Sequence, residues 1–381
     1  MPADTRMLDD EQRALVAMVR EFTAAEVVPV VRDYEDRAED PRPLYQKLAE
    51  LSLTGIPFPE GFGGMGTSYG TYLLVVEELA AAYLSLAIGL SVHTLCAFSI
   101  NEFGNDSQRK ELLAKLASGE WFGAYSLSEP GAGSDAASLT TKATRDGDMY
   151  VLNGSKAFCT RGNEADLILM MARTSEEGAA GVTAFLLRKG TAGFTGIKKE
   201  EKMGWRSSPT WMLGLDDVRL GEEDRLGEEG QGFRIAMASL DSGRLGIAAC
   251  GVGLAQAALD AAIWFTTERE QFGHPVAEQE GVRFMLADMG TSIEAARRLY
   301  KHAAALRDAG EDYSLQAAQA KLFATDVAMK VTIDAVQLHG GYGYVTEYPV
   351  ERYLREAKGL QIVEGTNQIQ RYVIGRKLIA D

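Results

Sequence analysis

Apolar residues recur at a helical spacing near both ends of this chain and change to a strand-like pattern between them. In the N-terminal part they lie three and four positions apart. Four helices are therefore predicted there, over residues 9–35, 42–55, 69–90 and 106–118. Asp9 or Asp10 is a suitable cap for the first helix.

The C-terminal part has longer helical patterns. They predict helices over residues 231–273, 280–310 and 314–340, and a last helix over 366–380. Residues 121–225 instead contain short β-prone runs separated by glycine-rich turns, and Asn153-Gly154 between two runs predicts a hairpin. We expect a mainly α protein with a small, mostly antiparallel sheet in the middle. The expected domains are residues 1–120, 121–225 and 226–381.

Composition excludes several classes of function. The 381 residues carry a net charge of -15, which argues against binding to nucleic acid or to an anionic membrane surface. The three cysteines and four histidines have no metal-ligand spacing, so we expect no metal site. No run of 18 apolar residues occurs, so we expect no membrane insertion. The acidic start "MPADTRMLDDEQ" resembles no targeting peptide, and we expect a cytoplasmic protein.

Two motifs accompany the predicted sheet. In "YSLSEPGAGSD", the glycines and Ser134 could offer N–H and hydroxyl donors to a phosphate, or could form a plain turn. A dinucleotide-binding βαβ unit is rejected because no such unit surrounds these glycines. In "NGSKAFCT", Phe158 and Thr160 would face one side of a strand. They would then suit a flat polar ring system, although the same residues are equally compatible with an edge hairpin that binds nothing.

The long helices carry further candidates. Arg244 and Arg269 lie in a largely apolar helical pattern, where they could contact an anion or simply be solvated. The glycines of "QLHGGYGY" could let the backbone approach a ligand closely, or could only end a helix. In "QIVEGTNQIQR", Glu364 is an isolated acid between Val363 and a glycine, and by itself it is most simply a surface turn residue.

Ten segments, taken in order, resemble the acyl-CoA dehydrogenase family over essentially the whole chain. They are "LSEPGAGSD", "NGSKAF", "KMGWRSSPT", "DVRL", "GEEGQGF", "REQFG", "LADM", "KLFATD", "QLHGGYGY" and "QIVEGTNQIQR". The resemblance implies an N-terminal helical domain, a small antiparallel β domain and a C-terminal four-helix bundle. It also implies FAD as cofactor, an acyl-CoA substrate, a homotetramer, and an electron-transfer flavoprotein as electron acceptor.

The resemblance also implies roles for individual residues. The flavin would be contacted by Tyr125, Leu127, Ser128, Ser134, Phe158, Thr160, Thr366 and Gln368. Arg269, Gln271 and Phe272 match the part that crosses to a neighbouring subunit's FAD, and Gln337, Gly340 and Gly341 match the stretch on its adenosine side. The thioester and acyl chain would be contacted by Ser134, Asp241, Arg244, Gly365, Leu95 and Val363.

Glu364 matches the catalytic base of the family. Removing a proton from Cα of a thioester and a hydride from Cβ needs a base on one face of the substrate and a flavin on the other. In the family, the carbonyl oxygen is polarised by the backbone N–H of the base residue and a flavin hydroxyl. A base that loses water when the acyl chain enters would have a raised pKa.

This chain departs from the family pattern at several places. The long helix near Arg244 carries no Glu that could replace Glu364 as the base, and Phe158 stands where Trp is common. Val363 replaces a common aromatic residue and Gly243 is small, so both would widen the acyl pocket. The motifs are closest to short-chain and branched-chain, isobutyryl-CoA-type members, so we expect a short-to-medium or 2-methyl-branched substrate.

Three alternatives remain open from the sequence. A dehydrogenase of secondary metabolism could act on an acyl-carrier-protein thioester instead of a CoA thioester. A flavin monooxygenase-type relative could share the fold, although those relatives lack the acid at the position of Glu364. The third alternative is a helical scaffold without activity, which a purified protein lacking flavin would favour.

Overall fold

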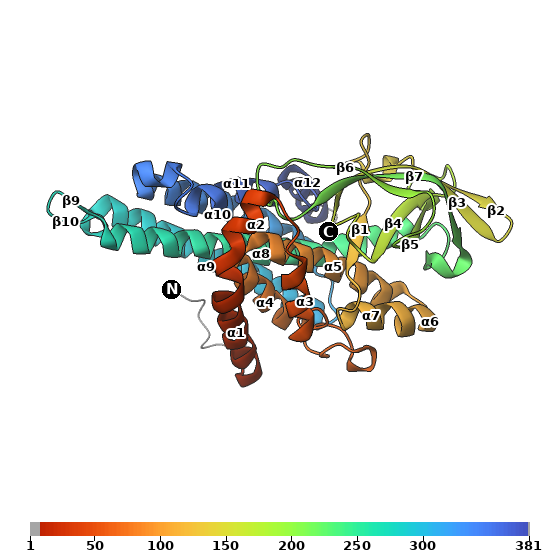
Figure 1. Cartoon of the computed structure of the whole chain (residues 1–381), viewed down its shortest axis with the longest axis horizontal. Coiled ribbons are helices and arrows are strands. Elements are labelled where there is room, and N and C mark those ends of the chain that lie inside the picture. Colours follow the sequence, from red (N-terminus) through yellow and green to blue (C-terminus); the bar gives the residue numbers. More distant parts are fainter. Residues whose placement is uncertain (1–7, 380–381) are drawn as a thin grey trace.

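The N-terminal region is a set of helices, seen in red to orange in Figure 1 of this computed structural model, which describes residues 8–379. The helices are α1 (Asp10–Phe22), α2 (Val31–Arg37), α3 (Arg42–Glu50), α4 (Tyr69–Ala82), α5 (Leu84–Phe103), α6 (Asp106–Gln108) and α7 (Ala114–Ala117). Asp9 caps α1, as predicted: its side chain accepts from the Gln12 backbone N–H at 2.7 Å. The N-terminal segment before residue 8, from which a cytoplasmic location was expected, lies outside the described residues.

Residues 69–90 do not form the single helix that the sequence predicts. The backbone of Tyr83 is extended (φ -157°, ψ 101°), so α4 ends at Ala82 and α5 starts at Leu84. The ring of Tyr83 is fully buried, and its hydroxyl bonds to the hydroxyl of Ser207 in the β domain. A contact distant in sequence thus accompanies a break that the local helical pattern does not indicate.

The central sheet is mostly antiparallel, as predicted. Its strands are β1 (Gly123–Ser126), β2 (Lys142–Asp146), β3 (Met149–Thr160), β4 (Leu167–Arg173), β5 (Val182–Arg188), β6 (Phe194–Lys199), β7 (Thr210–Gly221) and β8 (Arg225–Leu226). They follow the order β6-β7-β3-β2-β4-β5-β8, while β1 pairs with β4 in parallel. Both faces of β4 and β5 are buried.

The hairpin predicted at Asn153-Gly154 is wrong. The turn between β2 and β3 falls at Gly147, and Asn153-Gly154 lies inside the twelve-residue β3. The register of β3 against β7 shifts there, and the Asn153 amide exchanges two hydrogen bonds of 2.9 Å with Asp217. The glycine therefore forms a bulge in a long strand, a use of Asn-Gly that depends on the partner strand.

Long helices make up the C-terminal region and confirm the predicted fold class. They are α8 (Gly232–Glu268), α9 (Glu280–Asp308), α10 (Ser314–His339), α11 (Val350–Leu360) and α12 (Asn367–Leu378); a small hairpin, β9 (Glu270–Gln271) and β10 (His274–Pro275), follows α8. With 37 residues, α8 is about 55 Å long. The predicted end of the last helix at Ala380 lies outside the described residues.

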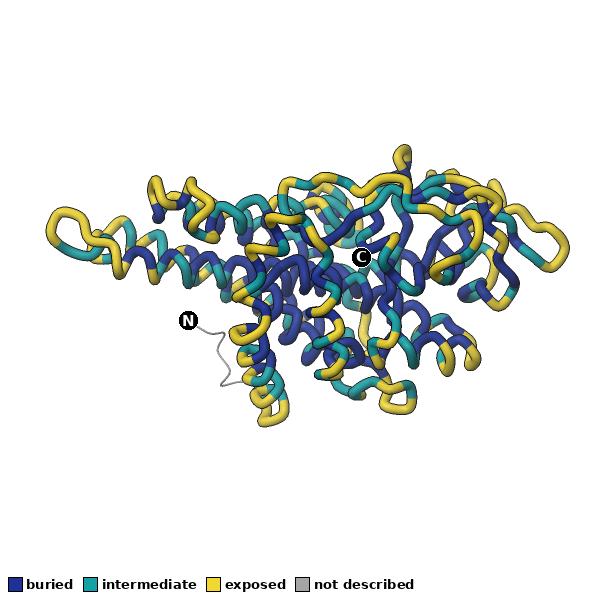
Figure 2. The backbone as a smooth tube through the Cα atoms, in the orientation of Figure 1, coloured by how far each residue is buried: buried dark blue, intermediate teal, exposed yellow. Residues whose placement is uncertain are grey.

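The buried core runs through the middle of the molecule, along α4, α5, α8 and α10 (Figure 2). Among the described residues, two helices are long and apolar enough to cross a membrane by length and composition, α5 and α8. The windows concerned are 89% and 72% buried inside the protein, which is the burial of core helices. The long apolar windows of α5 and α8 therefore pack against other parts of the protein.

Candidate active site

Glu364 lies in the short connection between α11 and α12, and its backbone has a positive φ of 53°. A left-handed conformation is unfavourable for a residue with a side chain and persists where surrounding bonds impose it. Gln370 supplies two such bonds, because its amide donates to the carbonyl of Glu364 at 3.2 Å and to that of Gly365 at 2.8 Å. The local backbone thus turns the Glu364 side chain back toward the core.

The carboxylate of Glu364 lies between α8 and α5. A Cβ placed on Gly243 of α8 would be 2.1 Å from Oε2 of Glu364 and 2.7 Å from a methyl carbon of Leu95 on α5. Oε2 is buried and has no hydrogen-bond partner among the described residues. Glycine at 243 therefore makes room for the acid, rather than for an acyl chain alone as the sequence suggested.

Burial raises the pKa of Glu364 to about 7, against the opposing effect of the positive charges of Lys321 and Arg244. Two tyrosines near it, Tyr69 and Tyr125, have pKa values raised chiefly by burial, so both stay neutral. A carboxylate with a free, buried oxygen and a pKa near 7 has the properties of a general base.

The other predicted thioester residues lie around this carboxylate. Arg244 of α8 is 6% exposed and pairs with Asp241 at 2.5 Å, while its Nε has no partner among residues 8–379. Leu95 is buried, and half-buried Val363 packs against the main core. The carbonyl of Gly365, which follows Glu364, accepts from Lys321 Nζ at 2.9 Å.

The loop after β1 holds the predicted flavin residues. The hydroxyl of Tyr125 donates to the carbonyl of Ala236 on α8 at 3.4 Å, Leu127 is buried, and the carbonyl of Ser128 accepts from the Ala157 N–H at 2.8 Å. The glycine-rich tip beyond it is open: Ser134 is exposed, and a Cβ on Gly131 would meet nothing within 4 Å.

A buried ion pair fixes the base of that loop. Glu129 and Lys156 are almost fully buried and lie 2.8 Å apart. The carboxylate of Glu129 also accepts from the backbone N–H groups of Thr140 at 2.6 Å and Thr141 at 2.9 Å. Burial alone would raise the pKa of Glu129, but Lys156 and these hydrogen bonds lower it to about 2. The loop is therefore held from β3 by a charged group.

Phe158 and Thr160 lie at the end of β3 next to this loop. Phe158 has a positive φ of 56° at a register shift between Lys156 and Cys159, and its ring is 72% exposed. Cys159 is buried and Thr160 is half-buried, so the two predicted residues alternate with an inward-facing cysteine. An exposed ring held at a bulge is an unusual use of a large apolar side chain.

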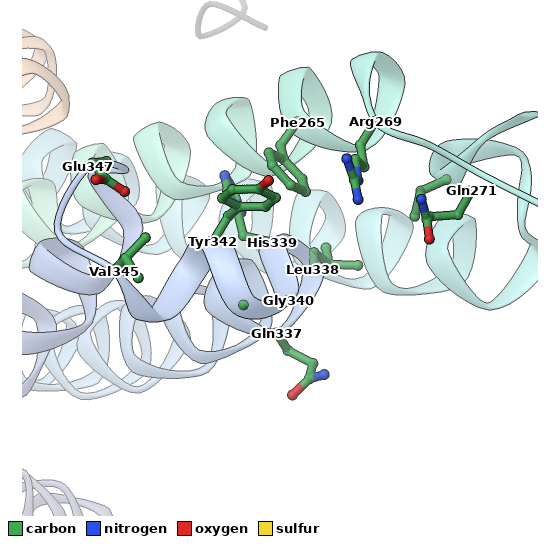
Figure 3. Close-up of a pocket in the computed structure, with 12 residues that line it drawn as sticks. Phe265, Arg269, Gln271, Gln337, Leu338, His339, Gly340, Tyr342, Val345 and Glu347 are labelled. Carbon is green, nitrogen blue, oxygen red and sulfur yellow. The ribbon is translucent and has the colours of Figure 1, made fainter.

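A second candidate site lies at the far end of α8. A cavity of about 540 Å³ lies there, between the end of α8 and the end of α10. Figure 3 shows residues that line it. The predicted residues in its wall are Arg269, Gln271, Gln337, Gly340 and Gly341. The guanidinium carbon of Arg269 lies 5.6 Å from the ring centre of Tyr342, and Phe272 on the adjoining hairpin is 93% exposed.

The remaining predicted residues start α12. The hydroxyl of Thr366 caps the helix by accepting from the backbone N–H of Ile369 at 3.3 Å, and Gln368 is exposed in the first turn. Among residues 8–379 no group of three or more His, Cys, Asp or Glu side chains is placed to hold a metal ion.

Sequence reasoning missed two residues near Glu364. The motif "KLFATD" predicts no role for Lys321 of α10, and the helical pattern over residues 69–90 predicts none for Tyr69 of α4. A signal for Lys321 was available, because it is a charged residue on the otherwise apolar face of a long helix. Tyr69 gave no such signal, since its place beside Glu364 depends on how α4 packs on α8.

The unpaired acid of raised pKa and the helix–sheet–helix order are compatible with an enzyme that uses a carboxylate as a base. Family models identify the class: "Acyl-CoA dehydrogenase, N-terminal domain" matches residues 9–120, the middle domain residues 124–218 and the C-terminal domain residues 230–379. The chain belongs to the acyl-CoA dehydrogenases, a family of flavin-dependent oxidoreductases, which confirms the family and the enzyme class expected from the sequence.

Individual relatives are similar over nearly the whole chain. An acyl-CoA dehydrogenase from Bacillus subtilis is 45% identical over 97% of this chain and 98% of its own length. A mitochondrial isobutyryl-CoA dehydrogenase from Dictyostelium discoideum is 42% identical over 98% and 90%. The solved butyryl-CoA dehydrogenase from Megasphaera elsdenii is 44% identical, with a TM-score of 0.96 over 98% and 99%. A glutaryl-CoA dehydrogenase from Mycobacterium smegmatis, solved with FADH2, is 31% identical, with a TM-score of 0.94 over 99% and 97%.

Proposed function

We propose that this acyl-CoA dehydrogenase forms the trans-2-enoyl thioester from a short or 2-methyl-branched acyl-CoA, with Glu364 as the base that removes the α-proton. The observation that carries the proposal is the buried, unpartnered Oε2 of Glu364 together with a pKa near 7. A carboxylate of ordinary pKa would be a weaker base, and one paired with an arginine would not be free to accept a proton.

The chain's own residues divide the work around the substrate. Glu364 accepts the α-proton at Oε2, and the apolar side chains of Leu95 and Val363 would help to exclude water from the reacting carbon. Its backbone N–H is the proposed donor to the thioester oxygen, where negative charge develops as the proton leaves. Asp241 and Arg244 lie at the α8 side, where they would position the thioester arm.

The residues fit FAD as the flavin. The exposed ring of Phe158 and the half-buried hydroxyl of Thr160 suit the edge of a flat ring system, next to Tyr125, Leu127, Ser128 and the open tip with Ser134. Thr366 and Gln368 would contact the same cofactor from α12. When bound, the flavin supplies the hydride acceptor for Cβ. The relative solved with FADH2 supports this cofactor.

The two groups of predicted FAD residues lie in different regions of the molecule. Arg244, beside the base, and Arg269, in the second cavity, are separated by about 37 Å along α8. Arg269, Gln271, Phe272, Gln337, Gly340 and Gly341 would therefore serve the FAD of another copy. This supports the proposed homotetramer, in which the exposed Phe272 would be covered.

Substrate size follows from the wall of the site. The space at Gly243 is taken by the carboxylate of Glu364. Val363 is smaller than the aromatic residue common at its position, which favours room for a branched acyl group. Relatives named for butyryl-CoA and isobutyryl-CoA support this range. Neither the carrier-protein dehydrogenase nor the monooxygenase-type alternative is favoured by the comparisons.

Further parts of the proposal rest on the family and on charge. An electron-transfer flavoprotein is the proposed electron acceptor, and the cytoplasm is the proposed location. The net charge of -15 supports the absence of nucleic-acid binding.

Anaerobic mixing of the purified protein with a panel of acyl-CoAs tests the function. We expect flavin bleaching fastest with butyryl-CoA or isobutyryl-CoA, and Glu364→Gln to slow it by about 10²–10⁴-fold with FAD still bound. A Glu364→Gln protein that bleaches at the wild-type rate would show that another group is the base. Bleaching rates with the same acyl groups on a carrier protein show whether the enzyme prefers a CoA thioester or a carrier-protein thioester.

A further inference from the structure

Lys321 is a fully buried lysine whose ammonium lies next to the loop of Glu364. Its Nζ donates to the carbonyl of Gly365 at 2.9 Å and to Oδ1 of Asn367 at 2.9 Å. Both acceptors are neutral oxygens, so the charge is buried without a carboxylate in direct contact. Such burial is costly, and a protein retains it where the charge has a use.

The bonds of Lys321 belong to a clamp between α10 and the loop. Asn367 in turn donates to Oγ1 of Thr325 at 2.9 Å and to Oδ1 of Asp326 at 2.7 Å, one turn further along α10. The amide of Gln361, on the other side of Glu364, also donates to Asp326 at 2.7 Å. One face of α10 therefore grips the chain both before and after Glu364.

The charges of Lys321 and Glu364 also influence each other's pKa. Burial lowers the pKa of Lys321 to about 7, and Glu364 is the strongest group that opposes this shift. In the other direction, Lys321 comes before Arg244 among the charges that lower the pKa of Glu364. The two groups therefore titrate as a coupled pair.

Other groups face the pair from each packed element. Arg244 comes from α8, Asp326 lies on α10, Tyr69 on α4 and Tyr125 on β1, and the buried thiol of Cys250 is on α8. The two tyrosines and the thiol are neutral, because burial raises their pKa values. Among these groups, Lys321 and Arg244 are the cations near Glu364.

We propose that Lys321 is a positioning residue for the base: it holds the left-handed turn at Glu364 and Gly365, and its ammonium favours the ionised carboxylate. This inference rests on the proposed role of Glu364. Lys321 acts through Glu364, because its hydrogen bonds go to the loop at Gly365 and Asn367. The need for such a cation is greatest when an acyl chain fills the pocket, because the substrate removes the remaining water from the carboxylate.

The test separates proton removal from oxidation. Acetyl-CoA has an α-carbon but no β-carbon, so it can exchange its α-hydrogens with D2O at the base but cannot be dehydrogenated. Mass spectrometry of acetyl-CoA incubated with the holoenzyme in D2O therefore reports on Glu364 alone. The exchange rate is measured from pH 5 to pH 9 to locate the pH below which the base is protonated.

Four variants distinguish charge from hydrogen bonding. Lys321→Met removes both, Lys321→Gln keeps donors to the loop without charge, and Lys321→Arg keeps the charge. Thr325→Val is the matched control, because it disturbs the same Asn367 from the next turn of α10 and removes no charge. If Lys321→Met does not fold, Lys321→Gln still tests the effect of removing the charge.

Removing a nearby cation raises the pKa of a carboxyl group, so the acid limb of the exchange profile is expected to move upward by about 1 pH unit or more in Lys321→Gln and Lys321→Met. Lys321→Arg and Thr325→Val should keep the wild-type limb. An unmoved limb in both charge-free variants, even with slower exchange, would reduce Lys321 to a purely structural role and overturn the proposal. A Glu364→Gln protein that still exchanges would instead overturn the base assignment.

Discussion

The loop of Glu364 and the cavity at the end of α8 are built in opposite ways, although both are proposed to serve one reaction. Glu364 is half-buried with its Oε2 atom fully buried, and its loop is bonded to α10 through Lys321, Asn367 and Gln361. The cavity is open at the tip of the molecule, where the hairpin with Phe272 is exposed in Figure 2. Its walls come from helix ends and a 3-10 turn.

This difference follows from what each region does. A base must keep a fixed direction and a shifted pKa, and both require burial and bonds within one chain. A surface that holds part of a large cofactor needs donors and open backbone, which helix ends and glycines supply. In the proposed assembly the first region is complete in one copy, whereas the second would contact the cofactor of another copy.

Gly243→Ala should have the largest effect, because it disturbs the position of the Glu364 carboxylate. The added methyl would lie 2.1 Å from Oε2 of Glu364, so the acid must move. A displacement of about 1 Å costs on the order of 10² in rate. We expect flavin reduction by butyryl-CoA to slow by at least about 10²-fold, measured by stopped-flow absorbance, with FAD content unchanged.

Gly290→Ala on α9 is the matched control, because its added methyl meets only Leu259, at an ordinary contact distance of 3.8 Å. It should leave the reduction rate unchanged and stabilise α9 by up to about 1 kcal/mol. Equal rates for Gly243→Ala and wild type would mean that Glu364 has room to shift without cost.

Arg269→Ala should affect the second region alone. Loss of a charged hydrogen-bond donor costs about 1.5–3 kcal/mol, so FAD affinity should fall by roughly 10-fold or more. The reduction rate per bound flavin should stay near that of wild type. Flavin absorbance per chain after gel filtration measures the first quantity, and stopped-flow measures the second.

Arg298→Ala provides the comparison for Arg269→Ala, since Arg298 is exposed on α9 and pairs with Glu294 at 2.6 Å. It should keep full FAD content. A normal FAD content in Arg269→Ala would mean that this cavity does not contribute to FAD binding.

The smallest expected effect is on stability as a function of pH. The folded pKa of Glu364 is raised to about 7, above its value in the unfolded chain, so the folded state binds an extra proton between about pH 4.5 and 7. This contribution to stability is complete below pH 4.5 and is lost as pH rises through 7. Glu364→Gln lacks it, so its Tm should exceed that of wild type more at pH 8 than at pH 5. Differential scanning calorimetry measures this, and a difference in Tm that is the same at both pH values would contradict the raised pKa.

Much of the fold was predictable because its signals are local. The apolar spacing predicts the ends of α8, α9 and α10 to within a few residues, and the change to a strand-like spacing predicts a sheet between the helical regions. The errors came where distant contacts decide: Tyr83 breaks a helix beside Ser207, and Asn153-Gly154 forms a bulge against Asp217 instead of a turn.

The candidate site divides in the same way. By itself, the sequence determined the chain's family and its helix–sheet–helix order and made Glu364 the candidate base, because ordered motifs and periodic patterns are properties of neighbouring residues. Only the tertiary structure decided that Glu364 is buried against Gly243 and Leu95, that Lys321 holds its loop, and that the second cavity lies about 37 Å away along α8. Burial, charge proximity and distance arise from packing between segments far apart in the chain, and these quantities set the pKa of the base.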